Sequence, residues 1–140
     1  MEILRLGPGD DARMKAAAHL FDGLPREDAT KRFLEDANHH LFLAYEREAP
    51  VGFVSGVELT HPDKGTEMFL YELSVDEPFR RRGIGRALVE SLAALARERG
   101  CYGMFVLAAD SNHAALETYR TGNPLREDGW VMFTWEPPGT

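Results

Sequence analysis

The junction at residues 73–100, LSVDEPFRRRGIGRALVESLAALARERG, constrains the fold of this chain more than any other stretch. An apolar strand runs into it, and a helix with apolar residues at helical spacing follows, ending at Gly100. The first N–H groups of such a helix have no backbone partner, and arginines stand beside them. Glycines at 83 and 85 let a ligand approach the backbone closely. The junction therefore predicts a site for a pyrophosphate.

The spacing of the glycines excludes the two most familiar phosphate loops. A dinucleotide fingerprint needs a third glycine where this chain has Leu88, and a P-loop needs a Gly-Lys-Ser/Thr ending that is absent. A different nucleotide-containing ligand is therefore expected.

The rest of the chain predicts a mixed α/β sheet with helices on both sides, in a single domain of residues 1–140. Residues 102–109 form an almost uninterrupted apolar run, as expected of a central strand covered on both faces. In residues 68–75, strict alternation would place Glu72 on the same face as Leu70. The predicted elements are a strand at 2–6, helices at 11–21 and 27–37, strands at 41–45, 51–59 and 68–75, a helix at 84–99, a strand at 102–109, a helix at 112–120 and a last strand at 130–136.

Composition limits the class of protein. Hydrophobic residues make up 44% and charged residues 28%, which favours a globular fold over disorder. No apolar run approaches the length of a membrane span, and the first residues lack the features of a signal peptide, so we expect a soluble, cytoplasmic protein without membrane partners. The formal net charge of −7 disfavours nucleic acid and favours a cationic partner.

Metal and disulfide chemistry are not expected. Cys101 is the only cysteine, so no internal disulfide or multi-cysteine metal site can form. His39 and His40 are adjacent, and the other three histidines lie in separate segments without ligand spacing. We therefore predict no metal.

The loop between strand and helix resembles the acetyl-coenzyme A pyrophosphate loop of the GNAT superfamily of N-acetyltransferases, with the pattern R/Q-x-x-G-x-G/A. Arg80, Gly83 and Gly85 match it position by position, and NHAALETYR resembles the N-x-x-A-x-x-x-Y segment of the family. The resemblance implies a mixed, mostly antiparallel central sheet flanked by helices, with acetyl-CoA as cosubstrate. The residues that it implies for cofactor binding are Leu73, Ser74, Val75, Arg80, Arg81, Arg82, Gly83, Ile84, Gly85, Arg86, Asn112, Ala115 and Tyr119.

A closer resemblance, over residues 69–119, is to the small aminoglycoside 3-N-acetyltransferases of that superfamily. It lies in the run Tyr71, Glu72, Leu73 and Val75, and in the acid-ended strand VLAAD. After Asp110, where such enzymes often carry further acids, this chain has serine and asparagine, and the segment after the last predicted helix also departs from their pattern. The resemblance implies acetylation of an aminoglycoside at its 3-amino group, and a role in antibiotic resistance.

Acetyl transfer to an amine needs a base, because an amine with a pKa near ~10 is almost entirely protonated at neutral pH. Glu72, on a mostly apolar strand where burial would raise its pKa, and Asp110, at the carboxyl end of a strand, are the two candidates. Structural roles remain open for both: a backbone or arginine partner for Glu72, and a helix cap for Asp110.

The other two catalytic requirements are assigned from the family. The resemblance implies that a strand bulge near residues 73–75 opens the sheet, so that a backbone amide there binds the oxyanion. It also implies that Tyr119 protonates the departing thiolate, against the alternative of a packed aromatic. No nucleophile elbow is present, so direct transfer is favoured over an acyl-enzyme.

Three functions follow in order of preference. The first is acetyl-CoA-dependent acetylation of a polycationic aminoglycoside. The second keeps the cosubstrate but uses another small amine, a polyamine or a protein N-terminus as acceptor, and the third is a non-catalytic acyl-CoA-binding module. The apolar residues at 130–136 fit either an interface strand of a homodimer, common for such folds by resemblance, or a plain core strand.

Overall fold

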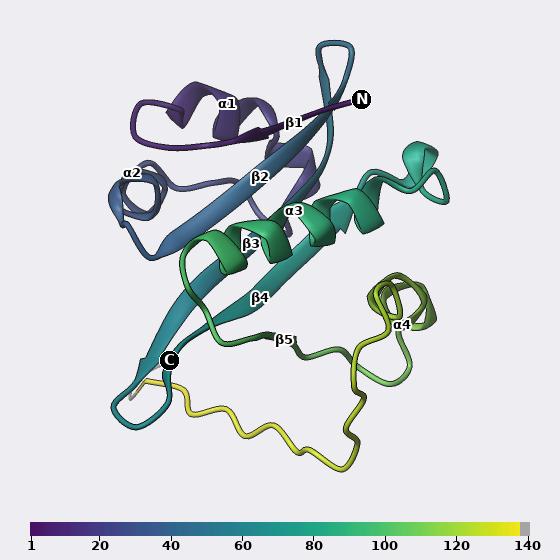
Figure 1. The fold of residues 1–140 in the computed structure, drawn as a ribbon. Helices are drawn as coiled ribbons and strands as arrows, with labels where there is room; N and C mark the ends of the chain where they lie inside the picture. The colour runs from purple at the N-terminus through teal and green to yellow at the C-terminus, as the bar shows by residue number, and fades with distance from the viewer. Residues whose placement is uncertain (138–140) are drawn as a thin grey trace.

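Five strands form one mixed sheet in the order β1-β2-β3-β4-β5 (Figure 1), in a computed structural model that describes residues 1–137. The first four strands pair in antiparallel fashion and β5 runs parallel to β4, which confirms the predicted mixed, mostly antiparallel sheet. The strands are β1 (Glu2–Arg5), β2 (His39–Glu46), β3 (Ala49–His61), β4 (Gly65–Val75) and β5 (Met104–Val106).

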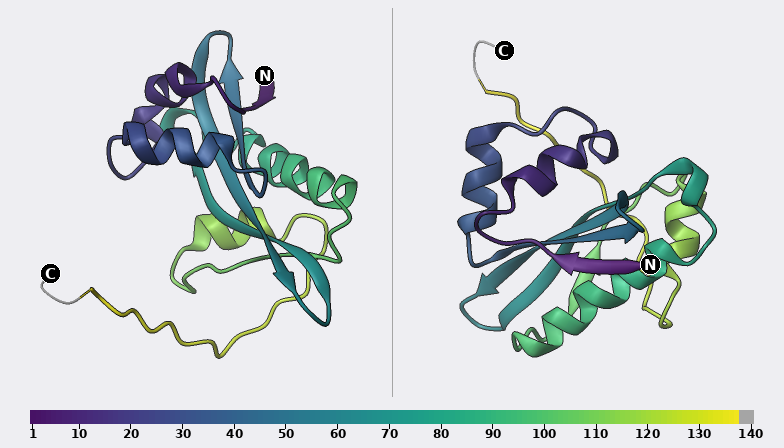
Figure 2. Two further views of the ribbon diagram at one scale, coloured as in Figure 1. Left: turned by 90° about the vertical axis from the view of Figure 1, so that its left-hand side faces the viewer. Right: turned by 90° about the horizontal axis from the view of Figure 1, so that it is seen from above.

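Helices cover both faces of the sheet, as predicted (Figure 2). Helices α1 (Asp11–Ala16) and α2 (Glu27–Glu35), with a short 3-10 turn η1 (Ala18–Leu20), cover one face. Helix α3 (Ile84–Glu98) covers the other face, and α4 (His113–Tyr119) lies beside α3. A second 3-10 turn, η2 (Glu77–Phe79), joins β4 to the loop before α3. Each face of the sheet has its own cluster of buried apolar side chains.

Helix α3 is the element that the sequence predicts best. Its apolar stripe lies against β3 and β4, with Leu88 and Leu92 fully buried. Gly56 of β3 makes this close packing achievable, because a Cβ atom there would lie 2.9 Å from the side chain of Leu92. Gly100 follows the helix with a φ of +76°, the left-handed conformation expected of a glycine at a helix end.

The alternation predicted for β4 is wrong in the half of the strand that carries Glu72. Ser55 of β3 pairs with Glu72, but the next residue, Gly56, pairs with Leu70, so Tyr71 is an extra residue in the ladder. Such a bulge reverses which face the following residues occupy. Leu70 is buried on the α3 side, whereas Glu72 lies on the opposite side, facing α1 and α2.

The two predicted strands at the C-terminal side of the chain are also corrected. The run at 102–109 forms only the three-residue β5, at the edge of the sheet and half-buried, rather than a central strand. The predicted strand at 130–136 is not formed: in the described residues this segment has no helix or strand, and its large side chains are exposed. A strand requires a neighbouring edge to pair with, and this segment runs away from β5 in the structure (Figures 1 and 2).

A polar cluster ties the C-terminal end of α3 to the strands. The Arg99 guanidinium donates to the Glu58 carboxylate, and the buried His40 Nε2 lies 2.6 Å from the same carboxylate oxygen. Because Arg5 can only donate to His40 Nδ1, at 3.0 Å, the Nε2 atom carries the proton and donates to Glu58. Burial, opposed by the hydrogen bond to Glu58, lowers the pKa of His40. The cluster links β1, β2, β3 and α3.

Residues 1–137 contain neither a metal-ligating cluster nor a membrane-spanning helix. Among residues 1–137, no group of three or more His, Cys, Asp or Glu side chains could hold a metal ion. None of the helices in the same range is long and apolar enough to cross a membrane.

Candidate active site

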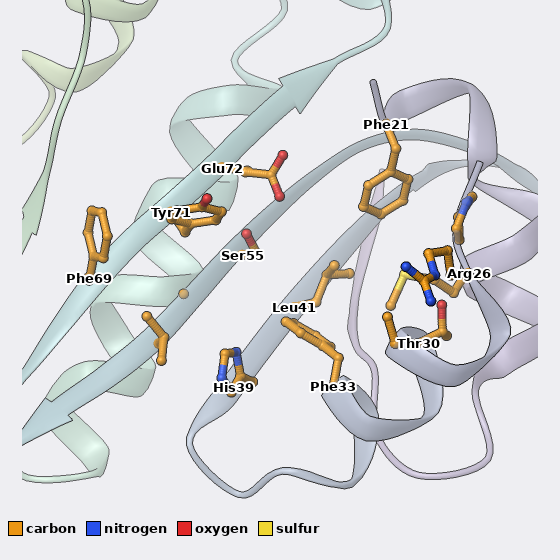
Figure 3. A pocket seen from close by; sticks show the side chains of 15 residues that line it. Phe21, Arg26, Thr30, Phe33, His39, Leu41, Ser55, Phe69, Tyr71 and Glu72 are labelled. Atoms are coloured by element: carbon orange, nitrogen blue, oxygen red, sulfur yellow. The ribbon is translucent and has the colours of Figure 1, made fainter. Parts of the chain in front are cut away.

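A pocket of about 400 Å³ opens between the α1–α2 layer and the middle of β3 and β4 (Figure 3). Phe21 and Phe33 come from the helical side, and Tyr71 comes from the sheet. The polar groups are few, and the one carboxylate among the lining residues is that of Glu72. An apolar pocket with few polar groups is the usual form of a small-molecule site.

Glu72 lies where the bulge turns β4 toward this pocket. Partial burial is the main cause that raises the pKa of its carboxyl above the ordinary value, and the negative charge of Asp22 raises it further. A carboxylate with a raised pKa is a better proton acceptor near neutral pH. The sequence predicts that burial raises the pKa of Glu72, but the predicted alternation places this side chain on the wrong face of β4.

Ser55 is a functional candidate that the sequence analysis missed. It is paired with Glu72 in the β3–β4 ladder, is only 5% exposed, and lines the pocket. Its Oγ atom is the one buried side-chain polar atom without a hydrogen-bond partner in the described residues. Leaving such a group unpaired costs stability, which a native protein rarely accepts without a reason. A lone hydroxyl in the apolar run VGFVSGV was the available signal.

Beyond Leu70, β4 has no strand partner on its β5 side among residues 1–137. The ladder between the two strands spans only Met68 to Leu70, paired with Met104 to Val106. The backbone of residues 71–74 therefore has no strand partner on that side, and the cofactor candidates Leu73, Ser74 and Val75 lie along this stretch, where the Val75 carbonyl accepts from Arg80. The register shift occurs at Tyr71, just before the stretch where the family resemblance implies a bulge.

The loop that carries the other cofactor candidates begins where β4 ends. The backbone N–H groups of residues 81–86 donate to no other backbone group in the described chain, whereas Ala87 N–H bonds to Gly83. Gly83 is the N-cap of α3 with a φ of +81°, and nothing lies within 4 Å of the place where a Cβ atom would stand. Arg80 donates to the carbonyl of Val75 at 3.0 Å, which fixes the loop to the end of β4.

The remaining loop residues combine open backbone with free positive charge. Arg81 and Arg82 are exposed, and Arg82 lies over the ring of Phe79, 5.1 Å from its centroid. Ile84 is buried beneath the loop and anchors it to the core, whereas Arg86 pairs with Glu90. These features can hold an anion at the start of α3.

Helix α4 approaches the loop from the side. A Cβ atom on Gly85 would lie 3.3 Å from the Thr118 side chain, so a side chain at position 85 would crowd α4. Tyr119 packs partly buried against the same core cluster as Leu73 and Val75, and burial raises the pKa of its phenol. A phenol that stays protonated at neutral pH can donate a proton.

The start of α4 contains the three other candidate residues. Asn112 caps the helix, its Oδ1 accepting from Ala115 N–H at 3.1 Å. Ala115 is half-buried. Asp110 is exposed in the turn between β5 and α4 and is not among the residues that line the pocket, so the structure does not bring it together with Glu72.

Together these elements form a path with three parts. An anion site lies at the start of α3, an open strand edge follows along residues 73–75, and a pocket with a carboxylate lies on the other face of the sheet. A long ligand with a phosphate end and a reactive end could follow this path and meet a second molecule near Glu72.

Known proteins share the sequence pattern and the fold of this chain. The model of the acetyltransferase (GNAT) family matches residues 11–122. A solved aminoglycoside acetyltransferase from an uncultured soil metagenomic sample, in complex with trehalose, is 25% identical with a TM-score of 0.89, covering 97% of this chain and 95% of that one. A second aminoglycoside acetyltransferase from such a sample is 26% identical with a TM-score of 0.84, covering 97% and 98%.

A curated relative points to another kind of amine. Thialysine N-epsilon-acetyltransferase of Caenorhabditis elegans is 28% identical over 106 residues, which are 74% of this chain. The match covers 66% of that relative, so the chain spans slightly less than two thirds of its length.

Proposed function

This chain belongs to the acetyltransferase (GNAT) family, and on that premise we propose that it moves the acetyl group of acetyl-CoA directly to a primary amine of an aminoglycoside, at the 3-amino group. The observation that carries the proposal is the position of Glu72, in a pocket that opens beside the free edge of β4. Acetyl-CoA comes from one side of the sheet, and the amine comes from the other.

In this proposal the loop at residues 80–86 holds the pyrophosphate of the cosubstrate. The open N–H groups at the start of α3 face it, and Arg81 and Arg82 supply charge. The pantetheine arm pairs with the backbone of residues 73 and 74, which β5 leaves without a strand partner, and this aims the thioester toward the pocket. A backbone N–H of the same stretch binds the oxyanion of the tetrahedral intermediate.

Glu72 acts on the acceptor. Its carboxylate attracts the substrate ammonium and removes a proton, directly or through a water, so that the neutral amine attacks the thioester carbon. The Ser55 hydroxyl, unpaired and facing the same pocket, accepts a hydrogen bond from an N–H of the amine and so orients it while leaving its lone pair free to attack. When the C–S bond breaks, Tyr119 protonates the thiolate of CoA.

The charges around the pocket support a cationic acceptor. Arg26 is the guanidinium among the lining residues, and it is bound by Asp28 through two hydrogen bonds of 3.2 and 2.9 Å. Asp28 thereby offsets the repulsion that Arg26 would exert on a cation, while Asp22 adds negative potential near Glu72. The two solved aminoglycoside acetyltransferases with TM-scores of 0.84 and above support an aminoglycoside in particular.

A second candidate acceptor is a small linear amine with a lysine-like end. It is favoured by the thialysine N-epsilon-acetyltransferase relative and by the small number of carboxylates in the pocket, where Glu72 stands alone. A polycation would bind better with several carboxylates around it.

The experiment is a thiol-release assay with acetyl-CoA against aminoglycosides, polyamines, thialysine and short peptides, followed by mass and NMR mapping of the product. We expect turnover with aminoglycosides and acetylation at the 3-amino group. Turnover confined to thialysine or polyamines would select the second candidate. CoA binding without turnover of any amine would instead indicate an acyl-CoA-binding module.

A further inference from the structure

The bulge in β4 brings two consecutive side chains to one pocket. In a regular strand, successive side chains point to opposite faces of the sheet. Phe69 and Tyr71 share the α1–α2 face by this alternation, and the extra residue in the ladder brings Glu72 to the same face. All three line the candidate acceptor pocket, whereas Leu70 is buried on the α3 side. An aromatic ring and a carboxylate are therefore neighbours both in the chain and at the pocket (Figure 3).

The Tyr71 ring is held in place by its neighbours without being covered by them. It makes a T-shaped contact with Phe69, with the ring centroids 5.6 Å apart and the planes at 82°. Phe69 is itself stacked on Phe105 of β5, with centroids 4.7 Å apart and planes at 3°. A T-shaped contact occupies at most one face of each ring. Tyr71, which is 65% exposed, therefore keeps a free ring face.

The exposure of Tyr71 sets it apart from the other rings of the pocket. Phe21, Phe33 and Phe69 are all half-buried, whereas Tyr71 is exposed and belongs to neither buried cluster. Single exposed aromatic residues are common on protein surfaces. This one, however, precedes the carboxylate that we assign to the acceptor amine, so its free face is available to the same molecule.

A free aromatic face beside a carboxylate matches the shape of a cyclic amine. A six-membered ring with equatorial substituents presents a flat face of axial C–H bonds, and its amino groups lie at its edge. The C–H bonds next to an ammonium carry part of the positive charge, which the negative face of an aromatic ring attracts. A linear amine has no such face, and its chain loses conformational entropy when it is ordered along the ring.

We propose that Tyr71 is a specificity-determining residue, whose ring face holds the amine-bearing ring of the acceptor and thereby favours cyclic over linear amines. The inference rests on the proposed function, because it concerns the acceptor of the same acetyl transfer. It gives the two candidate acceptors different contacts, since an aminoglycoside ring would lie on Tyr71 and a lysine-like chain would not. Tyr71 takes no proton and forms no bond in the reaction, so its effect belongs in the KM of the amine rather than in kcat.

The test compares cyclohexylamine with n-hexylamine, which have the same number of carbon atoms and a single amino group. Their binding to the full chain with CoA present is measured by NMR titration, and their acetylation by thiol release. Tyr71→Leu keeps an apolar side chain without a ring, and Tyr71→Phe keeps the ring. We expect Tyr71→Leu to weaken cyclohexylamine relative to n-hexylamine by about tenfold, and Tyr71→Phe to keep the ratio of the parent.

A matched control and a second measurement separate binding from folding. Tyr102→Leu replaces another exposed tyrosine, just before β5 and outside the pocket, and should keep the ratio of the parent. The second measurement needs no substitution. In a deuterated chain with protonated tyrosines, saturation of the tyrosine ring protons should reach the C–H protons of cyclohexylamine, because Tyr71 is the tyrosine among the lining residues.

Three results would overturn the proposal. They are an unchanged ratio of the two affinities in Tyr71→Leu, no binding of cyclohexylamine to the parent, and no transfer of magnetisation from the tyrosines. Failure of the proposed function has a different signature. If no amine is acetylated, the titrations and the NMR contact still decide the role of Tyr71. If acetylation is normal and the ratio does not depend on Tyr71, the proposed function stands and this inference fails alone.

Discussion

Ser55 and Glu72 are paired across the β3–β4 ladder at the bulge, and both line the same pocket. One presents a hydroxyl without a partner and the other a carboxyl with a raised pKa. Each of these conditions costs stability in the free protein, and both concern groups that an incoming ammonium would satisfy. Their coincidence is the strongest structural sign of where the acceptor binds.

Replacing Glu72 by glutamine should abolish most turnover while leaving CoA binding intact. The amide keeps the shape of the side chain but cannot accept the proton, and general-base catalysis typically contributes about 10²–10⁴-fold. Steady-state kinetics and calorimetry with CoA provide the two measurements. Glu98→Gln, on the exposed end of α3, is the control and should behave like the parent. Parent-like turnover in Glu72→Gln would remove Glu72 from the mechanism.

The same substitution should change how stability depends on pH. Burial raises the pKa of Glu72 in the folded state above its value in the unfolded chain, so the folded state holds the proton more tightly. The contribution of protonated Glu72 to the free energy of unfolding is therefore fully present below the pKa of the unfolded chain. It is lost as the pH rises through the pKa of the folded state. Urea unfolding across that window should show a smaller decline for Glu72→Gln than for the parent, and an equal decline would contradict the assignment.

Ser55→Ala should move stability and activity in opposite directions. Removing an unsatisfied buried hydroxyl should stabilise the free protein by about 1 kcal/mol. The loss of its hydrogen bond to the acceptor should at the same time lower kcat/KM for the amine. Ser91→Ala is the matched control, because Ser91 Oγ already donates to the carbonyl of Ala87 at 2.9 Å and lies on α3. A destabilised Ser55→Ala protein with normal kinetics would mean that the hydroxyl has only a structural role.

Gly83→Ala should weaken CoA binding by at least about tenfold, the equivalent of roughly 1.4 kcal/mol. The φ of +81° disfavours any side chain by about 1–2 kcal/mol, and the added methyl would stand where the phosphate approaches. Gly100→Ala introduces a similar strain, at a φ of +76°, far from the loop. Denaturant unfolding should find comparable losses of stability in the two variants. CoA titration should separate them, and equal CoA affinities would argue against the loop as the phosphate site.

Tyr119→Phe should lower kcat by about 10²-fold or more without changing the affinity for CoA, because the thiolate would leave without a proton donor. The buried ring would keep its packing against the core, so the melting temperature should change little. Tyr102→Phe, an exposed phenol beyond α3, is the control. A better leaving group on the thioester should restore much of the lost rate. The absence of such rescue would indicate that Tyr119 does not protonate the thiolate.

The loop and helix at residues 80–98 could be predicted in detail because their signals are local: a glycine pair, arginines and a helical stripe of apolar residues. The face occupied by Glu72 could not be predicted, because one extra residue at Tyr71 reverses it, and the sequence has no mark for a bulge. Ser55 escaped notice because its importance depends on having no partner, which only the packed structure shows.

The last predicted strand failed for a different reason. The segment is apolar as the prediction requires, but strand formation also depends on a neighbouring edge, and the sequence does not show that residues 130–136 lie away from the sheet. The position of Asp110, away from the pocket, likewise depends on how short β5 is, and the apolar run at 102–109 gave no sign of an early end.

The cluster of Arg99, Glu58 and His40 gives the two ends of α3 different attachments. The C-terminal end is tied by charge to β2 and β3, whereas the N-terminal turn is attached to the core by the apolar contacts of Ile84. If a bound nucleotide shifts this helix, the motion should be a small rotation about Arg99, with its largest amplitude at the glycines and almost none at the opposite tip. Amide exchange with and without CoA would therefore change along α3 as a gradient.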